Sequence, residues 1–322
     1  MKTIAEYSAD VESAIRSLEF PGGNLESLYG PIAYGLSAGG KRLRPVILLM
    51  GADAFGEAAG KALTPAVGIE TFHNFTLLHD DVMDRSDVRR GRPTVHKKYG
   101  ENAAILSGDT MLTLATEYVT DVDDDKLRKV LKTFDDMAIK VYEGQALDMD
   151  FETSDKTSLP EYMQMIEGKT GSLLGASAKI GAIIGGAGEK DADLMYDFGM
   201  AIGVAFQIQD DWLDTFGDPT TFGKPIGGDI LNSKKTYLYL SGISEHPDYA
   251  DALRAAMNMA PGESKIKTVT RLYEKLGIKE SAAKAVAHYS SKAMTSLKKT
   301  SLGDEEKEAF KKLAEKLIGR KK

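Results

Sequence analysis

The chain of 322 residues contains no cysteine. Disulfide bonds and thiolate chemistry are therefore excluded, and the composition is compatible with a reducing compartment. An excess of positive charge is also missing, since the formal net charge is −7 at pH 7. A negative balance of this size argues against nucleic acid or an anionic membrane surface as the main partner.

Convincing membrane segments are lacking as well. No basic, apolar and small-residue signal opens the chain. The nearest candidate for a span, residues 172–188, is short, rich in glycine and interrupted by Lys179. A buried helix whose small residues allow close packing explains this stretch better than a membrane span does. We therefore expect no membrane insertion and a cytoplasmic location.

Strand signals are scarce, because alternating β-branched runs bounded by hairpin turns do not recur. Helical periodicity extends over most of the chain. Helices are expected near 3–19, 24–37, 44–55, 61–84, 102–119, 126–150, 160–187, 190–216, 235–243, 248–258, 264–276, 279–300 and 304–318. No break between them has the length or low complexity of an interdomain linker. The sequence thus predicts a single all-α domain over residues 1–322.

An acidic cluster ends one of these expected helices. Residues 75–96 read FTLLHDDVMDRSDVRRGRPTVH, with Asp80, Asp81 and Asp84 within about one turn. Carboxylates that close repel one another unless a cation lies between them, and Mg²⁺ combines carboxylate oxygens, water and substrate phosphates. Arg89 and Arg90 follow, and guanidinium groups match phosphate geometry. The pattern indicates a diphosphate held between metal ions and arginines.

An isolated acidic cluster of this kind is more often a solvent-exposed helix face than a binding site. A second copy of the same spacing favours a functional role for the first. Residues 207–214 read QIQDDWLD and place Asp210, Asp211 and Asp214 at the end of another apolar helix. Other acidic runs, such as 121–125 and 135–136, lack the repeat. Six carboxylates in one apolar cleft would reject a diphosphate unless several metal ions bridged them to it.

Together with three further motifs, the two acidic clusters resemble the short-chain trans-isoprenyl diphosphate synthases of the polyprenyl synthetase family. The matching pieces are GGKRLRP at 39–45, the first acidic motif with RRG at 89–91, Lys169-Thr170, QIQDD at 207–211 and FGKPIGGDI at 222–230. They occur in family order over about two-thirds of the chain. The resemblance implies the isoprenoid synthase fold, a single bundle of roughly ten or more helices around a deep central cavity.

The resemblance also implies an activity: a Mg²⁺-dependent prenyltransferase that joins isopentenyl diphosphate head-to-tail to an allylic diphosphate. Three Mg²⁺ ions would be held by Asp80, Asp84 and Asp210, with Asp81, Asp211 and Asp214 completing the catalytic acids. Isopentenyl diphosphate would be bound by Lys41, Arg44, His73 and Arg90. The allylic diphosphate would be bound by Arg89, Lys169, Lys224 and either Lys234, which is preferred, or Lys235. Thr170 and Gln207 would face the carbocation.

Several of these assignments have plainer alternatives from the residues alone. GGKRLRP could be a helix start with solvated basic residues, and His73 a core histidine. His79 and His96 are interpreted as structural, and Gln145 and Asp148 as candidates to support the site. Residues 231–233 read LNS where many relatives have an acidic residue and glycine, which leaves the choice between the two lysines open. The basic tail, Arg320 to Lys322, could be solvated or could cover the isopentenyl diphosphate.

Side chains upstream of Asp80 are expected to set the product length. Phe75 and Phe72 would project to one face as successive obstacles, while Thr76 leaves more room than a second aromatic ring would. A C20 geranylgeranyl product is therefore favoured over C15 farnesyl diphosphate. A terpene cyclase and a non-catalytic partner subunit are the other readings. The resemblance further implies a homodimer.

Overall fold

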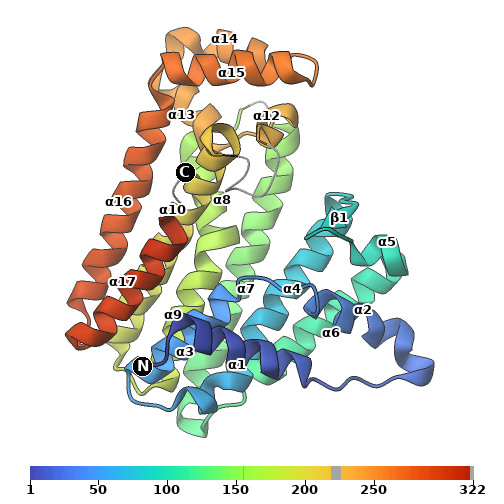
Figure 1. Ribbon diagram of the computed structural model, residues 1–322, viewed down its shortest axis with the longest axis vertical. Coiled ribbons are helices and arrows are strands. Elements are labelled where there is room, and N and C mark those ends of the chain that lie inside the picture. The colour runs from blue at the N-terminus through green and yellow to red at the C-terminus, as the bar shows by residue number, and fades with distance from the viewer. Residues whose placement is uncertain (155, 219–225, 320–322) are drawn as a thin grey trace. The chain divides into compact units, whose positions relative to one another are not determined.

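The computed structural model describes residues 1–154, 156–218 and 226–319 and is almost entirely helical (Figure 1). In chain order its helices are α1 (Ile4–Arg16), α2 (Glu26–Leu36), α3 (Leu43–Ala54), α4 (Leu63–Met83), α5 (Val95–Tyr99), α6 (Glu101–Val119), α7 (Asp124–Thr153), α8 (Leu159–Ile166), α9 (Ser172–Ile184), α10 (Glu189–Phe216), α12 (Gly228–Leu231), α13 (Tyr237–Glu245), α14 (Ala250–Met257), α15 (Glu263–Lys275), α16 (Ile278–Lys299) and α17 (Asp304–Ile318). Short 3₁₀ turns η1 (Gly23–Leu25), η2 (Ala59–Ala62) and η4 (Pro247–Tyr249) and a π-helical turn η3 (Glu167–Gly171) complete them. The expected all-α class is confirmed.

Local sequence explains where several helices begin. Thr3 and Ser158 each form a capping box, in which the side chain accepts from a backbone N–H three residues on and a glutamate there accepts in return. Helix α3 begins at Leu43, so Pro45 lies in its first turn, where a missing N–H leaves no helical hydrogen bond unmade.

Four features differ from the expected helix ranges. The range 160–187 is not one regular α-helix, because η3 widens it into a π turn at the glycines of EGKTG. Residues around RRGRP form a two-stranded antiparallel hairpin, β1 (Val88–Arg89) and β2 (Arg92–Pro93), which was not expected. The short helices α5 and α12 were also missed.

The described residues divide into two compact units. The first comprises residues 1–135 and 177–193. In it α4 packs closely against α6, because two glycines let the helices approach: a Cβ added to Gly68 would lie 2.7 Å from the Val119 backbone nitrogen, and one on Gly108 would lie 2.2 Å from His79 Nε2. The first acidic motif, at the C-terminal end of α4, is thus carried by a closely packed helix pair.

The second unit comprises residues 136–176 and 194–322 where described. Its core is built from α8, α10 and α13 to α16, with Tyr162, Val204, Leu253 and Tyr273 among the buried side chains. Helices α14 and α15 lie side by side, as do α16 and α17 (Figure 1). The expectation of a single domain over the whole chain stays a prediction.

Candidate active site

The first acidic motif lies at the C-terminal end of α4, and its three carboxylates differ in environment. Asp81 is only 3% exposed. Arg89 Nε lies 2.9 Å from both oxygens of Asp81, and Arg89 Nη2 lies 2.7 Å from Oδ1. Asp80 is half-buried, and Asp84, which caps the helix, is exposed. The middle carboxylate therefore fixes the arginine hairpin to α4, while the outer two lie at the surface.

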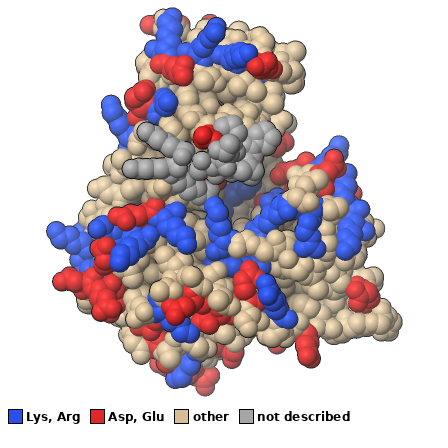
Figure 2. Space-filling model, in the orientation of Figure 1, with Lys and Arg blue, Asp and Glu red and all other residues tan. Residues whose placement is uncertain are grey.

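The hairpin geometry follows from two left-handed residues. Arg89 pairs with Arg92, and the two-residue loop between them has φ values of 54° at Arg90 and 75° at Gly91. Positive φ at both loop positions is the requirement of the tight hairpin turn that matches strand twist. The turn brings the Arg90 guanidinium against the backbone of Gly40, where an added Cβ would lie 2.7 Å from Nη1. Lys and Arg side chains gather over this hairpin and α5 (Figure 2).

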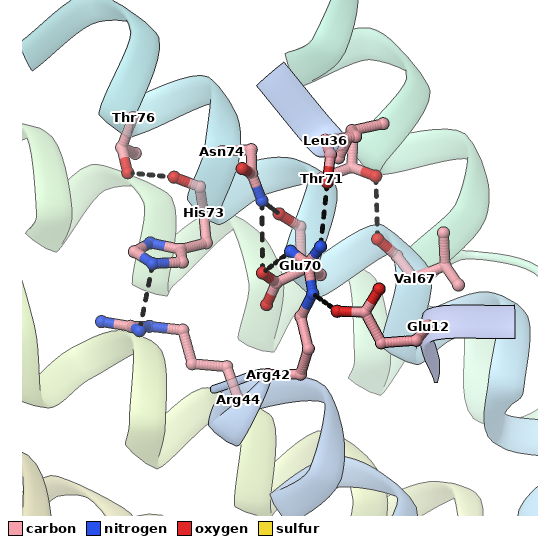
Figure 3. A network of polar contacts seen from close by, with 10 residues as sticks. All are labelled: Glu12, Leu36, Arg42, Arg44, Val67, Glu70, Thr71, His73, Asn74 and Thr76. Atoms are coloured by element: carbon pink, nitrogen blue, oxygen red, sulfur yellow. Dashed lines mark hydrogen bonds and ion pairs between the residues drawn. The ribbon is translucent and has the colours of Figure 1, made fainter. Parts of the chain in front are cut away.

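Arg42 in the basic motif has a structural role that sequence reasoning missed. It is 2% exposed and adopts φ 46° just before α3. Its guanidinium donates to Glu12 at 2.7 Å, Glu70 at 2.6 Å and the Leu36 carbonyl at 2.8 Å (Figure 3). A buried charge needs such partners. The local sequence KRLR does not predict that Arg42 is the buried arginine, because its two glutamate partners lie on helices distant in the chain.

Arg44 points the other way, toward His73, with Nη1 3.2 Å from the ring Nε2 (Figure 3). Burial and the charges of the surrounding arginines, Arg44 and Arg90 foremost, hold the pKa of His73 well below its usual value. The imidazole is therefore neutral near pH 7. Burial also lowers the pKa of Arg44, and within the described residues its buried Nε has no hydrogen-bond partner. Several cationic groups around a neutral imidazole make a positively charged cluster suited to an anion.

The expected isopentenyl diphosphate ligands thus lie on neighbouring elements of the first unit. Lys41 is exposed at the turn before α3, Arg44 contacts His73, and Arg90 lies against Gly40. Arg89, expected to bind the other diphosphate, is tied to Asp81. His79 packs on Phe75 and its Nε2 lies 3.1 Å from the Ile105 carbonyl, a structural role like the one expected.

In the second unit, Asp211 occupies the same kind of position as Asp81. It is 4% exposed. Its carboxylate accepts from the Tyr162 hydroxyl at 2.5 Å, the Tyr237 backbone N–H at 2.9 Å and Gln207 Nε2 at 3.2 Å. Burial, reinforced by the charge of Asp229, raises the pKa of Asp211 to about 7 although these hydrogen bonds oppose the shift.

The outer residues of the second motif are less buried than Asp211. Asp210 and Asp214 are both half-buried. Asp214 Oδ2 accepts from the backbone N–H of Asp229 at 2.9 Å, which holds the start of α12. Both acidic motifs therefore share one design, with a buried middle carboxylate held by the protein and flanking carboxylates nearer the surface.

The π turn η3 presents Lys169 and Thr170. Lys169 Nζ donates to Asp148 Oδ2 at 2.6 Å, and the Thr170 hydroxyl donates to Gln207 Oε1 at 3.2 Å. The glycines here serve close approach, because a Cβ on Gly144 of α7 would lie 2.3 Å from the Lys169 backbone nitrogen. Thr170, Gln207 and Asp211 thus form one hydrogen-bonded chain, and the half-buried Lys169 has an acidic partner.

The remaining residues expected to bind diphosphate are partly outside the described residues and partly in the segment before α13. Lys224 and the tail from Arg320 to Lys322 lie outside the described residues. Lys235 Nζ donates to the Phe151 carbonyl at 2.5 Å and to the Glu152 carbonyl at 3.4 Å, near the C-terminal end of α7. Lys235 therefore has a structural contact at the end of α7. The choice of Lys234 as the lysine for a ligand stays a prediction.

The aromatic side chains upstream of Asp80 are in contact with one another. Phe72 is fully buried and Phe75 nearly so. Their ring centroids lie 5.5 Å apart, and Phe72 also packs edge-on against Phe134 at 5.3 Å. The Thr76 hydroxyl donates to the His73 carbonyl at 2.8 Å, so its polar group is satisfied within α4.

The donor set suits Mg²⁺ better than a metal enclosed by protein alone. No three His, Asp or Glu side chains converge on one ion position within the described part of the chain. Mg²⁺ commonly takes one or two carboxylates and completes its shell with water and substrate phosphates. The half-buried Asp80 and the exposed Asp84 can supply such oxygens beside the arginine hairpin.

Comparison with known proteins adds independent information. The sequence model of the polyprenyl synthetase family matches residues 25–276. A geranylgeranyl diphosphate synthase of Methanosarcina mazei is 40% identical over 270 residues, which cover 83% of each chain. A geranylfarnesyl diphosphate synthase of Aeropyrum pernix is 41% identical over 227 residues, covering 68% of this chain and 71% of the relative.

The fold has equally similar neighbours among solved structures. A crystal structure of a geranylgeranyl pyrophosphate synthase superimposes with a TM-score of 0.94 and 42% sequence identity, covering all of both chains. No helix of the described residues is long and apolar enough to cross a membrane.

Proposed function

Because the chain belongs to the polyprenyl synthetase family, we propose that it is a Mg²⁺-dependent trans-prenyltransferase that condenses isopentenyl diphosphate head-to-tail with allylic diphosphates. The observation that carries the proposal is the shared design of the two acidic motifs. In each, a buried aspartate is held by the protein, Asp81 by Arg89 and Asp211 by Tyr162. The flanking aspartates lie nearer the surface.

The proposed binding of the metal ions uses these flanking carboxylates. Asp80, Asp84 and Asp210 would hold the ions, and the family resemblance implies three of them. Mg²⁺ held there would supply positive charge to a leaving diphosphate. Lys169 and Lys234 would bind the allylic diphosphate, and Arg89 would contact it from the hairpin.

The isopentenyl diphosphate would be bound by the cationic cluster around His73. Lys41, Arg44 and Arg90 supply positive charge, and the neutral imidazole supplies a hydrogen bond. A terpene cyclase ionises one diphosphate and does not need a second anion site of this kind. The cluster around His73 therefore supports condensation of two substrates.

The reaction requires charge separation, and the protein side chains can serve both partners. Cationic groups stabilise the departing diphosphate, and the oxygen dipoles of Thr170 and Gln207 would stabilise the allylic cation without offering it a strong nucleophile. The double bond of isopentenyl diphosphate attacks that cation, and a proton is then lost, in the family to the departing diphosphate. Water must be kept out, since it would trap the cation.

For the product we propose C20 geranylgeranyl diphosphate. Phe72 and Phe75 pack together on α4, and relatives with geranylgeranyl names support this length. The geranylfarnesyl name of another relative indicates that one further five-carbon unit is within reach of the same framework. The cytoplasmic location expected from the sequence stays a prediction.

The experiment that tests the function measures diphosphate release from an allylic diphosphate with and without isopentenyl diphosphate, together with mass analysis of the products. Release that requires isopentenyl diphosphate, with a C20 product, is expected. Asp84→Ala and Asp210→Ala should each abolish turnover while the helical circular dichroism stays near that of the unmodified protein. An Asp210→Ala enzyme with normal turnover would contradict the shared role of the two motifs.

A further inference from the structure

The segment 227–237, which carries Lys234, is held at both ends by the second acidic motif. At its start the Gly227 backbone N–H donates to the Asp214 carbonyl at 2.6 Å, and the Asp229 N–H donates to the Asp214 carboxylate at 2.9 Å. At its end the Tyr237 N–H, the first of α13, donates to Asp211 at 2.9 Å. The backbone conformation between these two anchored ends determines the position of Lys234.

The middle of the segment is a helix-ending turn with an unusual residue. The Ser233 N–H donates to the Ile230 carbonyl at 3.1 Å and the Lys234 N–H donates to the Asp229 carbonyl at 2.9 Å. This pair of bonds is the Schellman motif at the end of α12, whose left-handed residue is usually glycine. Here the residue is serine, with φ 53°. A side chain in this conformation is strained, so the turn needs support from outside.

Lys265 on α15 supplies that support. It is 1% exposed. Its Nζ donates to Ser233 Oγ at 2.7 Å and lies 3.3 Å from the Leu231 carbonyl in the last turn of α12. The Ser233 hydroxyl donates in turn to the Met257 carbonyl at 2.9 Å. One buried ammonium group therefore caps α12 and fixes the hydroxyl of its strained residue.

Burying a lysine against neutral acceptors is costly. Burial lowers the pKa of Lys265, in keeping with that cost. The hydrogen bonds of the Lys265 ammonium group go to the turn that precedes Lys234, and Lys235 on the far side is anchored to the end of α7.

We propose that Lys265 is a positioning residue for Lys234: by holding Ser233 in the left-handed conformation, it fixes the point at which Lys234 leaves the turn toward the allylic diphosphate. The inference rests on the proposed function, in which Lys234 binds that diphosphate. The serine and the buried lysine together replace the glycine that this turn would otherwise use.

Three variants separate positioning from simple packing. Lys265→Met keeps the length of the side chain but removes the ammonium group. Ser233→Ala keeps the strain and removes the hydroxyl. Ser233→Gly relieves the strain, so the turn no longer needs the lysine. Lys267→Met is the matched control, because this lysine lies on the same helix in an exposed pair with Glu263.

We expect Lys265→Met and Ser233→Ala to raise the KM for the allylic diphosphate about 10-fold to 100-fold, the effect of a displacement near 1 Å. The KM for isopentenyl diphosphate should stay unchanged. Adding Ser233→Gly to Lys265→Met should restore most of the loss, and Lys267→Met should have no effect. An unrescued double variant, or equal losses for both substrates, would overturn the proposal.

A second readout does not depend on activity. Trypsin cleavage after Lys234, followed by mass spectrometry of the native protein, should be faster in Lys265→Met and return toward the original rate in the double variant. If the unmodified protein fails to use isopentenyl diphosphate, the proposed function falls, while these cleavage rates still test the role of Lys265. Equal rates in all variants would show that Lys265 does not hold the turn.

Discussion

Adjacent charged residues of one motif divide into those that build the site and those that face its ligands. Arg42 lies between two glutamates, whereas Arg44, two residues on, contacts a neutral histidine. Asp81 is paired with an arginine, whereas Asp84 is exposed. A buried charge must be paired, because desolvation is costly. The paired members therefore position the motif and leave the other charges available to a substrate.

This division predicts opposite outcomes for two neighbouring arginines. Arg42→Ala leaves Glu70 buried and unpaired, which should lower the free energy of unfolding by about 3–5 kcal/mol. Arg44→Ala should change stability little but raise the KM for isopentenyl diphosphate about 10-fold to 100-fold, the loss of hydrogen bonds to a charged group. Denaturant unfolding and steady-state kinetics measure the two effects.

The control is Lys61→Ala, which removes an exposed ion pair with Glu57 and should alter neither quantity. A rise in KM of the same size for both arginine variants would contradict the division of roles.

At the scale of elements, the sequence predicts what is local and misses what depends on distant partners. The long helices follow from periodicity, and the acidic motifs follow from spacing. The arginine hairpin was missed because its left-handed loop position holds Arg90, which is not a usual turn residue. The pairing of Asp211 with Tyr162, and of Ser233 with Lys265, joins residues far apart in the chain. Neither hydrophobic periodicity nor a short motif predicts contacts between residues so far apart.

Helix α4 carries both the first acidic motif and the side chains expected to limit product length. Phe75→Ala should give longer products, and Phe75→Ala with Phe72→Ala should give products longer still, because each ring removed opens depth for further five-carbon units. Deleting a buried phenylalanine also costs about 3–5 kcal/mol, so the variants are assayed after circular dichroism has shown that they are folded. Mass analysis of the products measures the chain length.

Phe310→Ala is the matched control for this series. Phe310 is fully buried against Phe198 in the second unit, with ring centroids 5.6 Å apart. Its loss should destabilise the protein without lengthening the product. Unchanged products from the double variant of α4, or products of C30 or longer from the unmodified enzyme, would contradict the role of Phe72 and Phe75.

At the scale of the whole molecule, two helices present large apolar side chains to solvent. Ile105 and Leu106 on α6 are 41% and 58% exposed, and Ile139, Tyr142 and Met149 on α7 are 55%, 39% and 45% exposed. The three residues on α7 share a helix face by their spacing. Apolar side chains gathered on one face commonly mark a surface that another protein covers.

These faces support the homodimer that the family resemblance implies. Sedimentation at micromolar concentration should show a dimer of the unmodified chain. Leu106→Glu and Ile139→Glu place a charge that would have to be desolvated in an interface, which is costly without a partner, and each should shift the equilibrium toward monomer. Val88→Glu replaces a residue that is also exposed, at 62%, on the hairpin strand β1 and should leave the dimer intact. A fully active monomer at that concentration would count against the dimer, because the faces on α6 and α7 would then be exposed in the working enzyme.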